Sequence, residues 1–193
     1  NMFSMAGASL FLPFLPLLPE QILLTNLLTD FPEMTIATDS VDPETLDRPR
    51  RWDIRFIRRF MLTFGLLSSI FDYLTFGALL LVLKADPVQF RTAWFVESVV
   101  SACLIVLVVR SQRPFYRTMP SKYLIIATHV VVGATLVLPY SPLASLFQFS
   151  ALPLRYVTFL VAIVFVYIAS ADVAKRVFYE HIAQRGSSLC LDP

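Results

Sequence analysis

Long apolar runs separated by short polar loops dominate this sequence of 193 residues. The clearest is the stretch 60–83, whose 24 residues include a single charge, Asp72. About 20 such residues cross the ~30 Å hydrocarbon core of a bilayer as a helix. Mean hydropathy is +0.67 and only 16% of residues are charged, against about 25% in soluble domains. The sequence therefore predicts an all-α, polytopic helical membrane bundle in contact with the lipid bilayer.

Six membrane segments and a polar tail are expected. They lie at about 1–12, 17–37, 60–83, 92–109, 123–139 and 152–171, and residues 177–193 form the tail. At ~1.5 Å per residue the first segment covers only about 18 Å, so we expect Asn1 near mid-membrane, within the second half of a helix. On this interpretation the chain is a fragment of a longer protein, and residues 1–176 form one transmembrane domain.

The positive charges are distributed unevenly between the two sides of this topology. The segments 38–59, 110–122 and 175–193 hold 13 of the 16 Lys and Arg residues. Because cytoplasmic loops carry the excess of Lys and Arg, we expect these segments and the C-terminus in the cytoplasm. A net charge of +2 is too small to indicate a nucleic-acid partner.

Polar chemistry is concentrated in the second segment, at 26–33. Asn26 and Asp30 are four residues apart and share one face of a helix. Pro32 has no backbone N–H, so the carbonyl of Leu28 loses its usual partner, and we expect the helix to be interrupted near this point. An amide oxygen, a carboxylate and a carbonyl are hard ligands for a cation. The alternative is a polar kink that neighbouring helices satisfy, with no ligand.

Three further carboxylates fall at or near membrane depth: Glu33, Asp72 and Glu97. A charge at the bilayer centre costs at least about 2.5–3.5 kcal/mol, so these groups are expected to face the bundle interior, to pair or to bind a cation. We treat all three as candidate pathway residues. A structural hydrogen bond to a neighbouring helix explains Asp72 equally well.

The sequence contains no Gly-rich phosphate loop, no Ser–His–Asp arrangement and no Cys/His metal cluster. We therefore predict no catalytic residue and no cofactor site in this chain. By itself it is expected to hydrolyse no ATP.

The pattern N-L-L-T-D at 26–30, preceded by L-P-F-L-P-L-L-P-E-Q-I-L-L, resembles the fifth and sixth transmembrane helices of P-type cation ATPases. Other segments resemble the magnesium-transporting members in particular. These are D-S-V-D-P-E (39–44), R-P-R-R-W-D (48–53), S-S-I-F-D-Y-L-T-F (68–76), W-F-V-E-S (94–98), P-Y-S-P-L-A (139–144) and A-L-P-L-R-Y (151–156). The resemblance covers about residues 1–180.

This resemblance implies half of transmembrane helix 5 followed by helices 6–10 of such a pump. It implies a parent that moves Mg²⁺ across the bacterial inner membrane into the cytoplasm, driven by an aspartyl-phosphate cycle. Asn1, Asn26 and Asp30 would then be cation-site residues. The phosphorylated D-K-T-G motif, the nucleotide and actuator domains and the Pro-containing fourth helix do not occur in this sequence. ATP would act only through those missing parts of the same ATPase, which are the expected protein partners.

Two alternatives stay open. The chain could be a stand-alone membrane scaffold or regulatory subunit without transport chemistry, or part of a P-type pump for another cation such as Ca²⁺. Mg²⁺ keeps several waters in an octahedral shell and can use one carboxylate and an amide, whereas Ca²⁺ takes six to eight oxygens. Thr29 stands where magnesium-type relatives often carry Tyr, which leaves the ion preference open.

Overall fold

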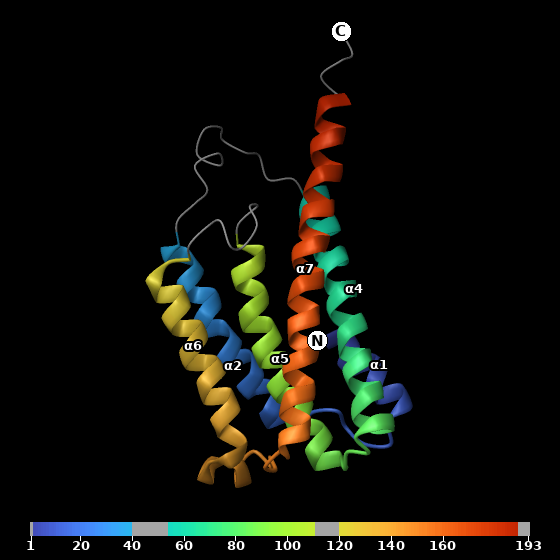
Figure 1. The fold of residues 1–193 in the computed structure, drawn as a ribbon, viewed down its shortest axis with the longest axis vertical. Helices are drawn as coiled ribbons and strands as arrows, with labels where there is room; N and C mark the ends of the chain where they lie inside the picture. The colour runs from blue at the N-terminus through green and yellow to red at the C-terminus, as the bar shows by residue number, and fades with distance from the viewer. Residues whose placement is uncertain (1, 40–53, 111–119, 189–193) are drawn as a thin grey trace.

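The computed structural model describes residues 2–39, 54–110 and 120–188, and every regular element in these ranges is helical (Figure 1). The elements are α1 (Met2–Phe11), α2 (Pro19–Thr35), η1 (Ile36–Thr38), α4 (Ile54–Gly77), η2 (Ala78–Val82), α5 (Pro87–Val109), α6 (Lys122–Val137), η3 (Leu138–Tyr140), η4 (Pro142–Ser145) and α7 (Leu154–Ser188). The predicted all-α fold is confirmed.

Four helical stretches are long and apolar enough to cross a membrane: Ile54–Val82, Pro87–Val109, Lys122–Tyr140 and Leu154–Glu180. The first two helices, α1 and α2, are shorter, with 10 and 17 residues. The findings therefore support a multi-pass helical membrane protein.

Helix α5 forms the centre of the bundle. It packs against α2, α4, α6 and α7, and 61% of its most apolar window is buried, against 28% for each of the other three spans. A buried helix of this kind is apolar on every face. Its large buried side chains include Phe90, Trp94 and Phe95. The remaining helices are thus positioned relative to α5.

The start of α5 is fixed by local chemistry. Pro87 occupies the first turn, where its missing N–H costs nothing, and the Asp86 carboxylate accepts hydrogen bonds from the N–H groups of Val88 (2.9 Å) and Gln89 (2.8 Å). We expect Asp86→Ala to lower the free energy of unfolding by about 1 kcal/mol. Chemical unfolding in detergent micelles measures this, and Asp86→Asn, which keeps an acceptor, should lose less than half as much.

Helix α2 differs from the prediction at Pro32. We expected an interruption near Asp30 to Pro32, but α2 is continuous from Pro19 to Thr35 and Pro32 is buried within it. That expectation was wrong. The ring removes one hydrogen bond, while packing of α2 against α5 and α6 keeps the helix together, as neighbouring helices commonly do for proline at membrane depth. The carbonyl of Leu28 still lacks an amide donor four residues on.

Side chains tie the helix connections together at one end of the bundle, the lower end in Figure 1. The Gln21 amide donates to the carbonyl of Phe147 (2.8 Å) and accepts from the N–H of Leu18 (3.0 Å), which fixes the start of α2. The Arg91 guanidinium donates to the carbonyl of Leu15 (2.9 Å). These bonds hold the turn before α2 against α5 and the segment between α6 and α7.

A second set of polar contacts closes the opposite end. The Asp39 carboxylate pairs with Arg110 (2.5 Å) and accepts from the N–H of Ser121 (2.7 Å). The ammonium of Lys175, fully buried, donates to the carbonyl of Val108 (2.8 Å). A cation at the last turn of a helix satisfies carbonyls that have no partner within the helix. The end of α5 is therefore joined to η1, α6 and α7.

Candidate functional site

A polar cavity of about 340 Å³ lies between α2, α4, α5 and α7, with α1 at its edge. Helix α2 contributes Thr25, Asn26, Thr29 and Glu33 to its wall. The facing polar residues are Ser68 on α4, Ser98 and Ser101 on α5, and Tyr167 on α7. The structure thus brings two of the predicted residues, Asn26 and Glu33, to one hollow.

Asp30 lies beside this cavity but does not line it. Its side chain is exposed, as is that of Asn26. Within the described part of the chain neither side chain makes a hydrogen bond, so their oxygens are accessible to a ligand. The two residues are one turn apart on α2, which keeps the carboxylate and the amide on neighbouring parts of the same face.

The threonines of α2 are satisfied within their own helix. The Thr25 hydroxyl donates to the carbonyl of Gln21 (2.9 Å), and the Thr29 hydroxyl lies 3.1 Å from the carbonyls of both Thr25 and Asn26. These carbonyls are therefore already used as acceptors. Among the backbone oxygens of this turn, that of Leu28 is the one whose usual donor Pro32 removes.

Asn1, the third predicted ligand, lies outside the described residues. The helix that follows it in the sequence, α1, reaches the cavity through Met5, which lines it. One residue earlier, the buried Ser4 hydroxyl donates to Asp72 on α4 (2.5 Å) and lies 3.3 Å from the Ser69 hydroxyl.

Asp72 lies behind the cavity, not in its wall. It is 3% exposed, and its second oxygen accepts from the indole N–H of Trp94 on α5 (3.1 Å). Both carboxylate oxygens are thus engaged by donors from other helices. The role of Asp72 as a pathway residue stays a prediction.

Glu97 is also buried, at 2% exposure, on α5. One of its oxygens, Oε2, has no hydrogen-bond partner among the described residues. The side chain lies against an apolar hollow of about 330 Å³ bounded by α5, α6 and α7. Its pathway role likewise stays a prediction.

Carboxylates do not cluster in this structure. Among the described residues no group of three or more His, Cys, Asp or Glu side chains is close enough to hold a metal ion together. A cation near α2 would therefore need amide, carbonyl or water oxygens besides Asp30, a donor set that suits a hard ion.

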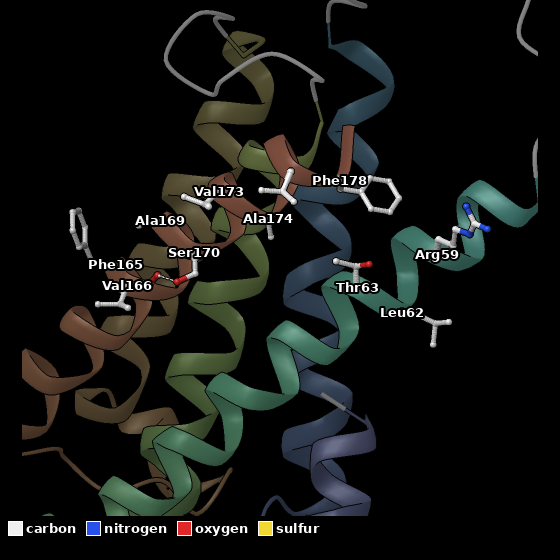
Figure 2. A pocket seen from close by; sticks show the side chains of 11 residues that line it. Arg59, Leu62, Thr63, Phe165, Val166, Ala169, Ser170, Val173, Ala174 and Phe178 are labelled. Carbon is white, nitrogen blue, oxygen red and sulfur yellow. Dashed lines mark hydrogen bonds between the residues drawn. The ribbon is translucent and has the colours of Figure 1, made fainter. Parts of the chain in front are cut away.

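A larger hollow of about 970 Å³ lies elsewhere, between α4 and α7 (Figure 2). Its wall is mostly apolar, with Arg59 at one side and the Ser170 hydroxyl turned back to the carbonyl of Val166 (2.8 Å). Among the described residues, no carboxylate or carboxamide lines it. We therefore do not place the cation site there.

Several residues in the cavity wall, and Ser4 next to it, were not identified from the sequence. Ser4, Trp94, Ser98 and Tyr167 come from three different helices, and their approach depends on tertiary packing. One signal was present for Ser98 and Ser101, since both follow Glu97 closely on an otherwise apolar run. Small polar residues of this kind favour close helix contacts in membranes.

Comparisons with known proteins show which family the whole chain resembles. Residues 14–177 match the family model described as "Cation transporting ATPase, C-terminus". The chain is 43% identical over 180 residues to the magnesium-transporting ATPase, P-type 1, of Escherichia coli K12. The aligned region covers 91% of this chain. Proteins of the same name from Salmonella typhimurium are 41% identical over 180 residues and 35% identical over 189, covering 91% and 95% of this chain.

The chain spans about a fifth of the length of these curated relatives, 20% or 21% of each. Since the family model covers most of the chain, from the turn before α2 into α7, it covers the residues of the polar cavity on α2, α4, α5 and α7. The chain therefore belongs to the cation transporting ATPase family and represents its C-terminal region.

Proposed function

We propose that this chain is part of the membrane domain of an ATP-driven Mg²⁺ transporter, in which it supplies part of the cation site and the helices that support it. Asn26 and Asp30 are the proposed ligands on α2, with Asn1, which precedes α1 in the sequence, as a third. The observation that carries the proposal is the position of Asn26. It lines a polar cavity, next to an accessible carboxylate one turn away, in a family whose relatives are named as magnesium-transporting.

The donor set suits Mg²⁺. One carboxylate, one or two amides and a freed carbonyl cannot complete an all-protein cage, but Mg²⁺ retains several waters and is bound through one or two carboxylates. The cavity wall next to Asn26 carries hydroxyls that can hydrogen-bond such waters, notably Ser98, whose hydroxyl is buried and has no partner among the described residues.

The sites that use ATP would lie in other parts of the same ATPase. We propose that phosphorylation and nucleotide binding are carried out there, and that α4 to α7 support the ion-binding helices. The C-terminus would lie in the cytoplasm, as the distribution of Lys and Arg favours. The membrane would be the bacterial inner membrane, since the relatives are bacterial proteins. Purified alone, this segment should show no ATP hydrolysis.

The proposal is tested with Asn26→Ala in the full-length protein. Loss of one ligand should raise the Mg²⁺ concentration for half-maximal ATPase activity about tenfold, equivalent to about 1.4 kcal/mol, with a smaller change in maximal rate. Activity is measured in proteoliposomes across a Mg²⁺ titration.

Leu23→Ala is the matched control, since Leu23 lies one turn earlier on α2 and is 70% exposed. It should leave the titration unchanged. A normal titration for Asn26→Ala would contradict the assignment of Asn26, and wild-type protein without Mg²⁺-dependent activity would contradict the proposed function as a whole.

A further inference from the structure

The two helices nearest the expected cation ligands, α1 and α2, pack mainly against different neighbours. Helix α1, which leads from Asn1, packs against α4. Helix α2, which carries Asn26 and Asp30, packs against α5 and α6. Besides the loop 12–18 that joins α1 to α2, the distance between the two sets of ligands depends on how α4 is joined to α5.

Asp72 on α4 forms the polar contact that joins α4 to α1 and α5. Its Oδ2 accepts from Ser4 on α1 (2.5 Å) and its Oδ1 accepts from Trp94 on α5 (3.1 Å). Ser4, Asp72 and Trp94 are 0%, 3% and 0% exposed, so water does not compete for these bonds. One carboxylate thus connects three helices by side-chain hydrogen bonds in a low-dielectric interior, where such bonds are strong and costly to leave unmade.

Besides Ser4, α1 buries Ala8, at 3% exposure, and packs Met5 partly against the hydrophobic core. Phe3, Leu10 and Phe11 are each more than 80% exposed. Gly7 packs so closely on Tyr73 of α4 that a Cβ atom would overlap the tyrosine hydroxyl. The contact of α1 with α4 is therefore close and specific at the two turns that include Ser4 and Gly7.

Trp94 connects this junction to the cavity. Its indole lines the polar cavity opposite α2 and packs edge-to-face on Phe76, with ring centroids 4.7 Å apart. One side of the tryptophan faces the proposed ion environment while its N–H is held by Asp72.

We propose that Asp72 is a positioning residue of the cation site, which fixes α1 relative to α2 through Ser4 and Trp94 without contacting the ion. This role rests on the proposed function of α2. It requires hydrogen-bonding groups at the end of the side chain but not a negative charge. An asparagine can accept from Trp94 through Oδ1 and donate to the Ser4 hydroxyl through Nδ2, whereas a leucine can do neither.

The variants Asp72→Asn and Asp72→Leu in the full-length protein separate the roles. Asp72→Leu should raise the Mg²⁺ concentration for half-maximal ATPase activity about tenfold, and Asp72→Asn should stay within about twofold of wild type. Thr75→Val is the matched control. Thr75 is fully buried one turn along α4, and its hydroxyl bonds only to the carbonyl of Phe71 in its own helix among the described residues. It should leave the titration unchanged.

A second readout does not depend on transport. Spin labels at Phe3 on α1 and Leu23 on α2, both exposed, report the distance between the two helices. The distance distribution should broaden in Asp72→Leu and remain narrow in Asp72→Asn and Thr75→Val. Ser4→Ala and Trp94→Phe, which each remove one donor, should give intermediate broadening, and they keep the test available if Asp72→Leu does not fold.

Two outcomes would overturn the proposal. Unchanged distances and an unchanged Mg²⁺ titration in Asp72→Leu would show that the junction does not position α1. Equal loss in Asp72→Asn and Asp72→Leu would show that the charge itself acts on the ion. If wild-type protein lacks Mg²⁺-dependent activity, the proposed function fails, while the distance measurement still decides the role of Asp72.

Discussion

Asp30→Asn is expected to abolish Mg²⁺-stimulated ATPase activity in the full-length protein. The substitution keeps the shape of the side chain and one oxygen but removes its negative charge. Asp30 is the one acidic residue among the proposed ligands, and a cation must be partly stripped of water to bind there. Removing one partner of a desolvated charge pair costs about 2–5 kcal/mol, so we expect the Mg²⁺ affinity to fall at least about 30-fold.

The matched control is Glu33→Gln, three residues along α2. It removes the same charge from a residue that lines the polar cavity but is proposed to border the ion's path and not to bind the ion. We expect its Mg²⁺ titration to stay within about threefold of wild type. Wild-type Mg²⁺ dependence in Asp30→Asn would remove Asp30 from the site, and equal loss in both variants would make Glu33 a ligand.

The largest effect on stability is expected from Asp39→Ala. The substitution breaks the ion pair between Asp39 and Arg110, whose side chains are only 6% and 2% exposed, respectively. It also removes the acceptor for the N–H of Ser121. Breaking a buried pair by deleting one partner costs about 3–5 kcal/mol. The midpoint of thermal unfolding of the membrane domain in detergent should fall accordingly, and amide exchange at Ser121 should accelerate.

Asp39→Asn separates the two contributions. Its carboxamide oxygen can still accept from Ser121, so exchange at the start of α6 should remain slow while the ion pair with Arg110 is lost. A loss of less than about 1 kcal/mol in Asp39→Ala, the range of surface pairs, would show that this contact does not hold η1 to α5 and α6.

Local sequence patterns were sufficient for the fold class. A run such as 60–83 is too long and too apolar for a soluble helix, so the membrane assignment followed from length and hydropathy. The relation of Asn26 to Asp30 followed from helical periodicity alone, because residues four apart share a face in any helix.

Other features depend on contacts between distant segments. Ser4 and Asp72 are 68 positions apart, and Asp72 and Trp94 are 22 apart, so no local pattern indicates that one carboxylate joins them. The expected interruption at Pro32 was wrong for the same reason, since it ignored contacts with distant segments. A proline by itself predicts a break, and only the neighbours of α2 explain why the helix continues.

The central position of α5, which packs against four other helices, has a consequence for how the sequence can change over evolutionary time. A residue on the outer face of α6, such as Val130 at 63% exposure, can be exchanged for another apolar residue with no change elsewhere. At Trp94 or Phe95, both at 0% exposure, a change of volume leaves a void or a clash. Substitutions along α5 should therefore occur in compensating pairs, each with a partner on a different helix, whereas those on α6 should occur singly.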